Sequence, residues 1–311
     1  MLKAIVYHRY GSPDELRLEQ VPEPQLERDD HVLVRVHATS INSWDWDLLR
    51  GRLMVGRRPR HPVMGADVAG RVEAAGAAVT RLRAGDAVYG DVSGCGWGGL
   101  GEYVCVPERA LAAMPAGLSF EQAAAVPQAG VLAWQGLRYR GEVQPGHRVL
   151  MIGAGGGVGT LAVQMAKASG AVVTAVDSAP KLDRLRSLGA DEVIDYRRES
   201  IAGSYDRIID LFASVARRRA LRPGGVYGVI GGSLPRIAQT ALVGLVSRRK
   251  RAGVVIHRPG REPLEALTPL LEAGTVVPVI DGTYALEDAR AAFERYGSGE
   301  FIGKVVITHA V

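Results

Sequence analysis

One glycine-rich string has the residue types and the spacing to bind a phosphate group. Residues 149–159 read VLMIGAGGGVG, an apolar run typical of a buried strand that continues through glycines into the helical residues 160–168. Glycines let the backbone turn tightly and approach a ligand, while the free N–H groups and dipole of the helix favour negative charge. A pyrophosphate is therefore expected at the N-terminus of this helix.

The glycine register differs from the strict dinucleotide pattern G-x-G-x-x-G. The best match is Ala154-x-Gly156-x-x-Gly159, with alanine in the first position. Such a string is weak evidence in isolation, but the strand before it and the helix after it favour dinucleotide binding over a structural turn. The predicted phosphate-binding residues are Ala154, Gly155, Gly156, Gly157, Val158 and Gly159.

The residues after the next predicted strand have the types that recognise the ribose of a dinucleotide. This strand, residues 172–176, is followed by Asp177, close to the roughly 20-residue spacing at which such folds place the ribose-binding residue. Asp177 could accept hydrogen bonds from a ribose diol, which favours NADH. Ser178 and Lys181 could instead hold a 2′-phosphate, which favours NADPH.

Tyr196 follows the third predicted strand, where its ring could stack on the adenine. Arg197 and Arg198 come next and add positive charge, although for the arginines alone a solvated loop is the simpler interpretation. The balance of these residues favours NADPH and leaves NADH open.

The elements that position these residues form two patterns along the chain. The first hundred or so residues alternate short β-type runs, including 32–36 and 68–72, with glycine turns. From about residue 120, short apolar strands alternate with helices, which predicts an α/β fold with a doubly wound parallel sheet. The expected helices there are 121–138, 159–169 and 181–188, and the expected strands are 148–152, 172–176, 192–194, 207–211 and 225–230.

The last fifty residues are expected to return to the first domain. They predict a helix over 262–273, an extended run over 276–280, a helix over 285–296 and a last strand over 304–308. The glycine-rich run 94–101 is expected to be a flexible loop that closes over a ligand.

Composition excludes several classes of protein. The chain has 311 residues and is 47% hydrophobic, enough for a full core, and its opening residues lack the pattern of a secretory signal. Its apolar runs are far shorter than the roughly 20 residues that cross a bilayer. We therefore expect a cytoplasmic protein with no membrane association.

A net charge of +5 is explained by a cofactor that carries phosphate. The basic run 248–251 is most simply the solvated end of an apolar helix, 237–246. Because no long basic stripe with interleaved aromatic residues is present, we do not expect nucleic-acid binding.

Short strings along nearly the whole chain resemble one family. They are Lys3 to Tyr7, Tyr10-Gly11, Ala38 to Asp45, Gly65 to Asp67, Ala69-Gly70, Gly85-Asp86, Gly101 to Tyr103, Ala123 to Val126, Ala133 to Gln135, the glycine turn, Leu188 to Asp191 and Gly303 to Val306. In this order they resemble the zinc-free quinone oxidoreductase and NAD(P)-dependent alcohol dehydrogenase-like branch of the medium-chain dehydrogenase/reductase superfamily.

The resemblance implies a Rossmann NAD(P)-binding domain over 123–258 and a GroES-like, β-rich catalytic domain over 1–122, to which 259–311 returns. It implies that Asn42 lies beside the nicotinamide and the substrate, that Asp45 shapes the same loop, and that Ile230 and Gly231 line the nicotinamide ribose. Asn42 and Asp45 could instead simply cap a turn. The resemblance also implies a homodimer, with residues 253–257 as the candidate edge strand.

Zinc members of the superfamily carry a cysteine and a Gly-His-Glu string where this chain has Asn42 and Gly65-Ala66-Asp67, and Gln128 lies near the expected third ligand. An amide and a methyl group cannot replace a thiolate and an imidazole in a zinc site. The only cysteines, Cys95 and Cys105, are too few for a structural four-thiolate site. The sequence therefore predicts no bound metal.

Without a metal, the cofactor supplies the hydride and the protein orients the acceptor. We therefore expect a small-molecule substrate, either a quinone or an α,β-unsaturated carbonyl, reduced by NAD(P)H. Two alternatives stay open. One is an enoyl or ketone reductase of a particular pathway. The other is a non-catalytic, crystallin-like protein that binds the cofactor or RNA.

Overall fold

The structure is a computed structural model that describes residues 1–52, 59–60, 62–213, 219–246 and 251–310. The chain forms two compact units. The first unit contains Met1–Ala129, Pro259–Ala273 and Pro278–Val311, and the second contains Gly130–Arg258 with Gly274–Val277.

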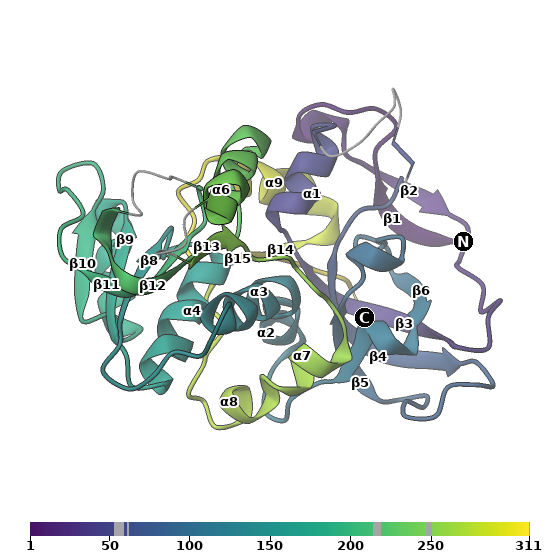
Figure 1. Ribbon diagram of the computed structural model, residues 1–311. Helices are drawn as coiled ribbons and strands as arrows, with labels where there is room; N and C mark the ends of the chain where they lie inside the picture. Colours follow the sequence, from purple (N-terminus) through teal and green to yellow (C-terminus); the bar gives the residue numbers. More distant parts are fainter. Residues whose placement is uncertain (53–58, 61, 214–218, 247–250, 311) are drawn as a thin grey trace. The chain divides into compact units, whose positions relative to one another are not determined.

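The first unit is built on a mostly antiparallel sheet (Figure 1). Its strand order is β14-β15-β3-β4-β5-β7, with β6 also paired to β3, and β1 and β2 form a separate hairpin. The strands are β1 (Leu2–Val6), β2 (Arg17–Val21), β3 (His31–Ser40), β4 (Asp67–Ala75), β5 (Ala87–Asp91), β6 (Tyr103–Pro107), β7 (Leu111–Ala113), β14 (Ile280–Ala285) and β15 (Lys304–Thr308).

Both ends of the chain contribute to this sheet, because β15 pairs antiparallel with β3 and places Val306 opposite Ser40. The helices of the first unit are α1 (Ser43–Leu49), α2 (Phe120–Ala124), α7 (Arg261–Glu265), α8 (Thr268–Glu272) and α9 (Ala289–Gly297). A core of buried side chains, including Phe293, Ile307 and Leu48, joins α9, β15 and α1. This core packs α1 and α9 against β15.

The second unit is a six-stranded parallel sheet in the order β10-β9-β8-β11-β12-β13 (Figure 1). Its strands are β8 (Arg148–Ile152), β9 (Val172–Asp177), β10 (Glu192–Asp195), β11 (Tyr205–Asp210), β12 (Leu221–Val229) and β13 (Arg251–Val254), and its helices are α4 (Gly157–Ala168), α5 (Leu182–Ser187) and α6 (Leu234–Val246). Helix α3 (Pro127–Arg138) runs across the boundary between the units.

This sheet confirms the predicted doubly wound α/β fold. The chain runs outward from β8 through β9 to β10 and then returns to start again at β11, on the other side of β8. The order of the strands therefore reverses between β8 and β11. In open parallel sheets, the carboxyl ends of the strands at such a reversal form the usual ligand-binding crevice.

Two predicted helices are each interrupted by a proline. The expected helix 121–138 is two helices, α2 and α3, and Pro127 begins the second. The expected helix 262–273 is likewise divided into α7 and α8, with Pro269 in the first turn of α8. Proline has no N–H to donate to the carbonyl oxygen four residues before it, so the helical hydrogen-bond ladder is interrupted at Pro127 and at Pro269.

Two other predictions concern the C-terminal part of the chain: one helix begins later than predicted, and one basic run lies mostly outside the described residues. The helix predicted over 285–296 begins at Ala289, because the preceding residues extend β14 as far as Ala285, which pairs with Thr308. Most of the basic run 248–251 lies outside the described residues, and Arg251 begins β13.

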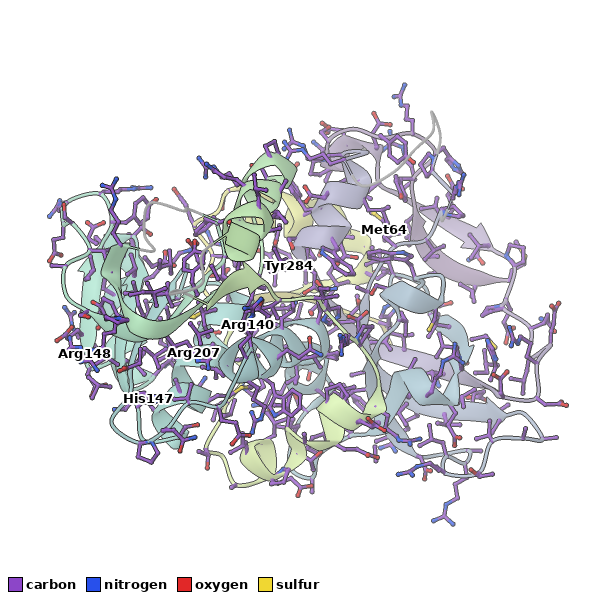
Figure 2. The ribbon with its side chains drawn as sticks, viewed as in Figure 1. Met64, Arg140, His147, Arg148, Arg207 and Tyr284 are labelled. Atoms are coloured by element: carbon purple, nitrogen blue, oxygen red, sulfur yellow. The ribbon has the colours of Figure 1, made fainter. Side chains whose placement is uncertain are left out.

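A buried arginine closes the C-terminal end of α3. Arg207 on β11, labelled in Figure 2, donates hydrogen bonds to the carbonyl oxygens of Gly136 at 3.1 Å, Tyr139 at 2.8 Å and Gly141 at 2.5 Å. The last carbonyl groups of a helix have no partner within the helix. Arg207 therefore satisfies them from the neighbouring sheet.

Replacing Arg207 with methionine should destabilise the second unit by about 3 kcal/mol, because the carbonyl groups lose charged donors while they stay buried. Urea unfolding followed by tryptophan fluorescence measures the loss. Arg222→Met is the matched control, since Arg222 pairs with Asp206 at a partly exposed site and its loss should cost less than about 1 kcal/mol. Equal losses in the two variants would contradict a capping role for Arg207.

Candidate functional site

The glycine turn lies between β8 and α4, at the carboxyl end of the central strand. Gly153 follows β8 with a φ of +82°, a conformation that favours glycine. A Cβ atom on Gly159 would lie 2.5 Å from the Cα of Ala154 and 2.5 Å from the Gly153 carbonyl oxygen, so only glycine lets α4 pack this closely on the turn. The glycines therefore permit the sharp turn and the close packing of α4 that the sequence predicts.

Gly156 is the N-cap of α4 and carries no side chain that could bond the first N–H groups of the helix. A Cβ atom at this position would meet only the Gly153 carbonyl oxygen, at 3.7 Å, so the turn is open on this side. Gly157, Val158 and Gly159 form the first turn of the helix. An anion can approach their N–H groups from this open side.

Asp177 is bonded to the glycine turn. One of its carboxylate oxygens accepts the Gly155 N–H at 2.7 Å, and the other accepts the Ser178 N–H at 2.8 Å. The Lys181 ammonium lies 3.7 Å from the carboxylate, and both side chains are nearly buried. The three residues predicted to discriminate between cofactors therefore meet at one point, where the carboxylate holds the turn and the lysine together.

Tyr196 lies next to this point because β10 pairs with β9 and brings Asp195 opposite Asp177. The Tyr196 N–H donates to the Asp177 carbonyl oxygen at 3.2 Å, and the Tyr196 side chain is 51% exposed. The Arg197 guanidinium lies 5.6 Å from the centre of its ring. An exposed aromatic ring with a neighbouring cation is suited to stacking on a flat base.

Ile230 and Gly231 follow β12, where the Ile230 N–H donates to the Asp210 carbonyl oxygen at 3.0 Å. A Cβ atom on Gly231 would lie 2.8 Å from the Leu211 carbonyl oxygen, so this glycine permits a close approach between the ends of β11 and β12. Both residues therefore lie at the same edge of the sheet as the glycine turn.

Phe212 belongs to this edge and was missed by the sequence reasoning. Its ring is 53% exposed and would be 2.9 Å from a Cβ atom on Gly153. Its N–H donates to the Asp210 carboxylate at 2.8 Å, and that carboxylate also accepts the buried Tyr227 hydroxyl at 2.7 Å. An aspartate at the end of an apolar strand, followed by an aromatic residue, was the available signal.

Two predicted site residues, Asn42 and Asp45, lie in a buried polar cluster of the first unit, called here the Asp67 cluster. It consists of Ser40, Asn42, Asp45, Asp67, Asp91, Gln128 and Lys304, all of them buried. The Asp67 carboxylate is its centre and accepts the Asn42 side-chain amide at 2.9 Å and the Gln128 N–H at 2.9 Å.

Three further contacts complete the centre of this cluster. The Ser40 hydroxyl lies 2.9 Å from the Asp67 carboxylate, and the Lys304 ammonium lies 3.2 Å from it. Lys304 also donates to the amide oxygen of Asn42. Asn42 is only 6% exposed, so its polar atoms are used within the protein.

The Asp45 carboxylate accepts hydrogen bonds from backbone N–H groups of two neighbouring segments. One carboxylate oxygen accepts the Asn42 N–H at 2.8 Å, and the other accepts the N–H groups of Gly65 at 3.1 Å and Ala66 at 3.2 Å. Burial raises the pKa of Asp45 to about 7, and the negative charge of Asp67 contributes to the rise. Asp45 thus joins the start of α1 to the segment that precedes β4, which agrees with the alternative of a capping role.

The donors in the Asp67 cluster do not fit a zinc ion. Of the three residues at the positions of zinc ligands, Asn42 and Gln128 are amides and Ala66 has only a methyl group. The Lys304 ammonium also bonds both Asn42 and the neighbouring Asp67. Zinc in proteins is bound by thiolate, imidazole and carboxylate groups. Burial also raises the pKa of the Cys95 and Cys105 thiols, which opposes the thiolate form.

Within the described part of the chain, no three or more His, Cys, Asp and Glu side chains are grouped so that they could hold a metal ion. Among the same residues, no helix is both long and apolar enough to cross a membrane.

The glycine-rich run 94–101 is more tightly held than expected. The Gly99 N–H donates to the Gly65 carbonyl oxygen at 3.0 Å. Leu100 is buried, and its N–H donates to the Met64 carbonyl oxygen at 2.9 Å. His309 lies 3.0 Å from the Gly99 carbonyl oxygen, and burial lowers its pKa to about 4, so its imidazole is neutral at physiological pH. The end of this run is therefore packed against other segments of the first unit.

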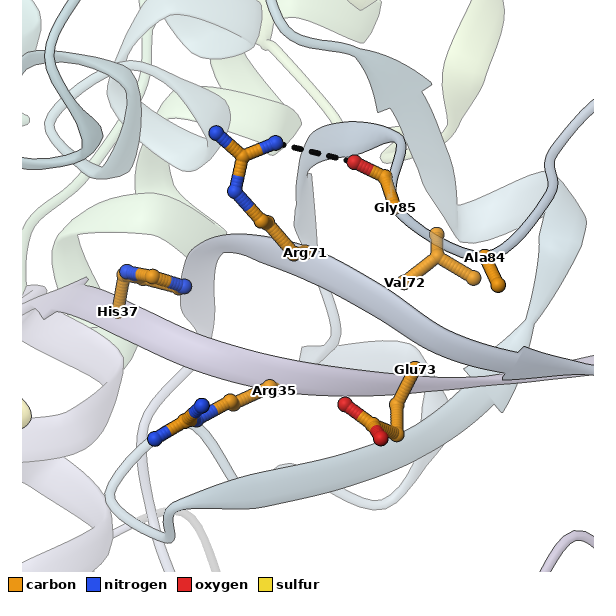
Figure 3. A pocket seen from close by; sticks show the side chains of 7 residues that line it. All are labelled: Arg35, His37, Arg71, Val72, Glu73, Ala84 and Gly85. Atoms are coloured by element: carbon orange, nitrogen blue, oxygen red, sulfur yellow. Dashed lines mark hydrogen bonds between the residues drawn. The ribbon is translucent and has the colours of Figure 1, made fainter. Parts of the chain in front are cut away.

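An open pocket of about 350 Å³ lies on the surface of β3 and β4 (Figure 3). Arg71 donates to the Gly85 carbonyl oxygen at 3.0 Å, and His37 stacks on Phe120 with ring centres 4.1 Å apart. Burial, with the charges of Arg35 and Arg71, lowers the pKa of His37. None of the residues that line this pocket was predicted as a site residue. They are Arg35, His37, Arg71, Val72, Glu73, Ala84 and Gly85.

Comparison with known protein families matches both parts of the chain. Residues 28–116 match the family described as alcohol dehydrogenase GroES-like domain. Residues 188–307 match the family described as zinc-binding dehydrogenase.

Individual proteins match over almost the whole chain. A 2-methylene-furan-3-one reductase from Solanum lycopersicum is 35% identical over 98% of this chain and 79% of its own length. A chloroplast envelope quinone oxidoreductase homolog from Arabidopsis thaliana is 32% identical over 99% of this chain and 98% of its own length. The solved quinone oxidoreductase from Coxiella burnetii superposes with a TM-score of 0.89 and 28% identity, covering 99% of both chains.

Proposed function

The chain belongs to the medium-chain dehydrogenase/reductase superfamily, in its quinone oxidoreductase-like branch, and we propose that it is an NADPH-dependent reductase that works without zinc. Its substrate would be a quinone or an α,β-unsaturated carbonyl. The similarity to a 2-methylene-furan-3-one reductase and to quinone oxidoreductases supports this class of acceptor. The bound nicotinamide would supply the hydride.

The observation that carries the proposal is the convergence of five predicted residues at the carboxyl ends of β8, β9 and β10 in the second unit. The glycine turn presents the open N-terminus of α4, where the N–H groups of Gly157 and Val158 would hold the pyrophosphate. Ser178 and Lys181 lie beside the turn, where they would hold a 2′-phosphate, and Tyr196 would stack on the adenine.

The environment of Asp177 favours NADPH over NADH. Its carboxylate accepts backbone N–H groups on both oxygens, so it is already bonded within the protein and less able to accept a ribose diol. Lys181 lies beside it as a cation that a 2′-phosphate can share.

The Asp67 cluster supports the absence of zinc. One of the matching families is described as zinc-binding, yet the donor set here contains two amides and an ammonium. The proposed reaction therefore involves no metal. Asn42, by its resemblance to the family, would lie beside the nicotinamide and the acceptor, where the protein's contribution is to orient the acceptor.

Two further features of the proposal concern assembly and location. Strand β13 is at the edge of the parallel sheet, so its outer side could pair with the same strand of a second copy in a homodimer. The exposed Ile256, which follows β13, would be covered in such a pair. A location in the cytoplasm stays a prediction.

The test is calorimetric titration of the protein with NADPH and with NADH after treatment with a chelator, followed by NADPH oxidation against a panel of quinones and enones. We expect tighter binding of NADPH and turnover that chelation does not reduce. Binding of neither nucleotide would overturn the proposal. Turnover that requires added Zn²⁺ would overturn its metal-free part.

A further inference from the structure

A lysine from the last strand of the chain supplies the positive charge inside the Asp67 cluster. Lys304 is the first residue of β15 and is only 4% exposed. The antiparallel pairing of β15 with β3 places Val306 opposite Ser40, which brings Lys304 close to Asn42 although 262 positions separate them in the sequence. Its ammonium bonds both the Asn42 amide oxygen and the Asp67 carboxylate.

The cluster is rich in buried carboxyl groups. Asp45 on α1, Asp67 on β4 and Asp91 on β5 are each no more than 2% exposed. Burial raises the pKa of Asp67 and the charge of Asp91 adds to this effect, whereas the Lys304 ammonium opposes it. A buried carboxylate without a compensating cation is strongly destabilising. Lys304 is therefore the group that opposes the effect of burial on the pKa of Asp67 and favours its ionised form.

Lys304 and Asp67 together determine which way the Asn42 amide points. An ammonium can only donate hydrogen bonds, so it must face the amide oxygen. An ionised carboxylate can only accept them, so Asp67 must face the amide nitrogen, which lies 2.9 Å away. The reversed amide would place its NH₂ group against the ammonium and its oxygen against the carboxylate. The two charges thus leave one orientation for Asn42.

We propose that Lys304 is a positioning residue, whose ammonium occupies the cation position of the Asp67 cluster and fixes the orientation of the Asn42 amide. This inference rests on the proposed function where it links Asn42 to the hydride acceptor. Lys304 acts on the reaction through Asn42 and does not touch the nicotinamide nucleotide. Its removal should therefore change the turnover of the acceptor and leave the affinity for NADPH unchanged.

The sequence allows a direct measurement of the amide, because Asn42 is the only asparagine among the 311 residues. Protein labelled with ¹⁵N in the asparagine side chain should give a single pair of amide proton signals. In the wild type we expect slow exchange of these protons with water, since both the oxygen and the nitrogen are bonded within the buried cluster. In Lys304→Met we expect at least 10-fold faster exchange.

Three variants separate this role from a general loss of stability. Lys304→Met should lower the unfolding temperature, and more so as pH rises from 6 to 8, because the unpaired Asp67 is better tolerated when protonated. Asp67→Asn/Lys304→Met removes both charges and should recover at least half of the lost unfolding temperature. Lys167→Met is the matched control, since Lys167 pairs with Asp191 at a partly exposed site of the second unit. This substitution should change neither the unfolding temperature nor its dependence on pH.

The kinetic expectation is at least a 10-fold loss of kcat/KM for the acceptor in both Lys304 variants, with NADPH affinity within 2-fold of the wild type. If Lys304→Met does not fold, both measurements are made on the double variant. The Asp67→Asn substitution adds a second asparagine signal to that variant, and comparison with the wild type identifies the signal of Asn42. Unchanged Asn42 exchange together with unchanged kcat/KM in the folded variants would overturn the inference. Failure of the wild type to bind NADPH would overturn the proposed function instead, and amide exchange would still test the role of Lys304.

Discussion

Replacing Gly159 with alanine is expected to abolish most nucleotide binding and to destabilise the second unit. The added Cβ atom would lie 2.5 Å from the backbone of Ala154 and Gly153, so α4 must move away from the glycine turn. Overpacking of this kind costs about 2–3 kcal/mol, and the displaced helix no longer presents its N–H groups to the pyrophosphate. We expect at least a 100-fold loss of NADPH affinity by calorimetry, together with a lower unfolding temperature.

Gly156→Ala is the matched variant in the same turn. Its Cβ atom would have only one neighbour, the Gly153 carbonyl oxygen at 3.7 Å, so the protein should keep its unfolding temperature. The methyl group would nevertheless stand on the open side of the turn, where the phosphate is expected, and should lower NADPH affinity about 10-fold, which corresponds to about 1.4 kcal/mol. Full NADPH affinity in this variant would contradict the predicted position of the phosphate.

Replacing Lys181 with methionine should reverse the nucleotide preference. An ammonium that bonds a 2′-phosphate contributes about 1.5–3 kcal/mol, so NADPH affinity should fall about 10- to 150-fold. NADH has no such phosphate, and its affinity should change by less than about 3-fold, or about 0.6 kcal/mol. Calorimetric titration of each nucleotide in low salt measures both values.

Lys167→Met is again the control, because this lysine belongs to the same unit and pairs with Asp191 rather than with Asp177. It should leave both affinities unchanged. Equal losses for NADPH and NADH in Lys181→Met would mean that Lys181 acts by holding Asp177 and the glycine turn, and would contradict recognition of a 2′-phosphate.

The amino-acid sequence by itself determined the edge of the second unit at which nucleotide binding is proposed. Strand β8, the glycine turn and α4 are consecutive in the chain, so apolar periodicity and the conformational freedom of glycine define them without knowledge of distant contacts. Asp177 and Lys181 follow the next strand at a spacing that a parallel sheet imposes. Helix boundaries were less predictable at Pro127 and Pro269, where the missing N–H of proline interrupts a segment of continuous helical composition.

Only the tertiary structure decided what the polar residues of the first unit do. Asn42, Asp67 and Lys304 come from α1, β4 and β15, and no spacing along the chain indicates that they meet. The pairing of β4 with β3 places Asp67 opposite Ser40, and the pairing of β15 with β3, which joins the two ends of the chain in one sheet, brings in Lys304. Burial then makes the charge of Lys304 necessary. Pairing between distant strands and loss of solvent are properties of the folded chain, so the orientation of Asn42 could not be predicted from local sequence.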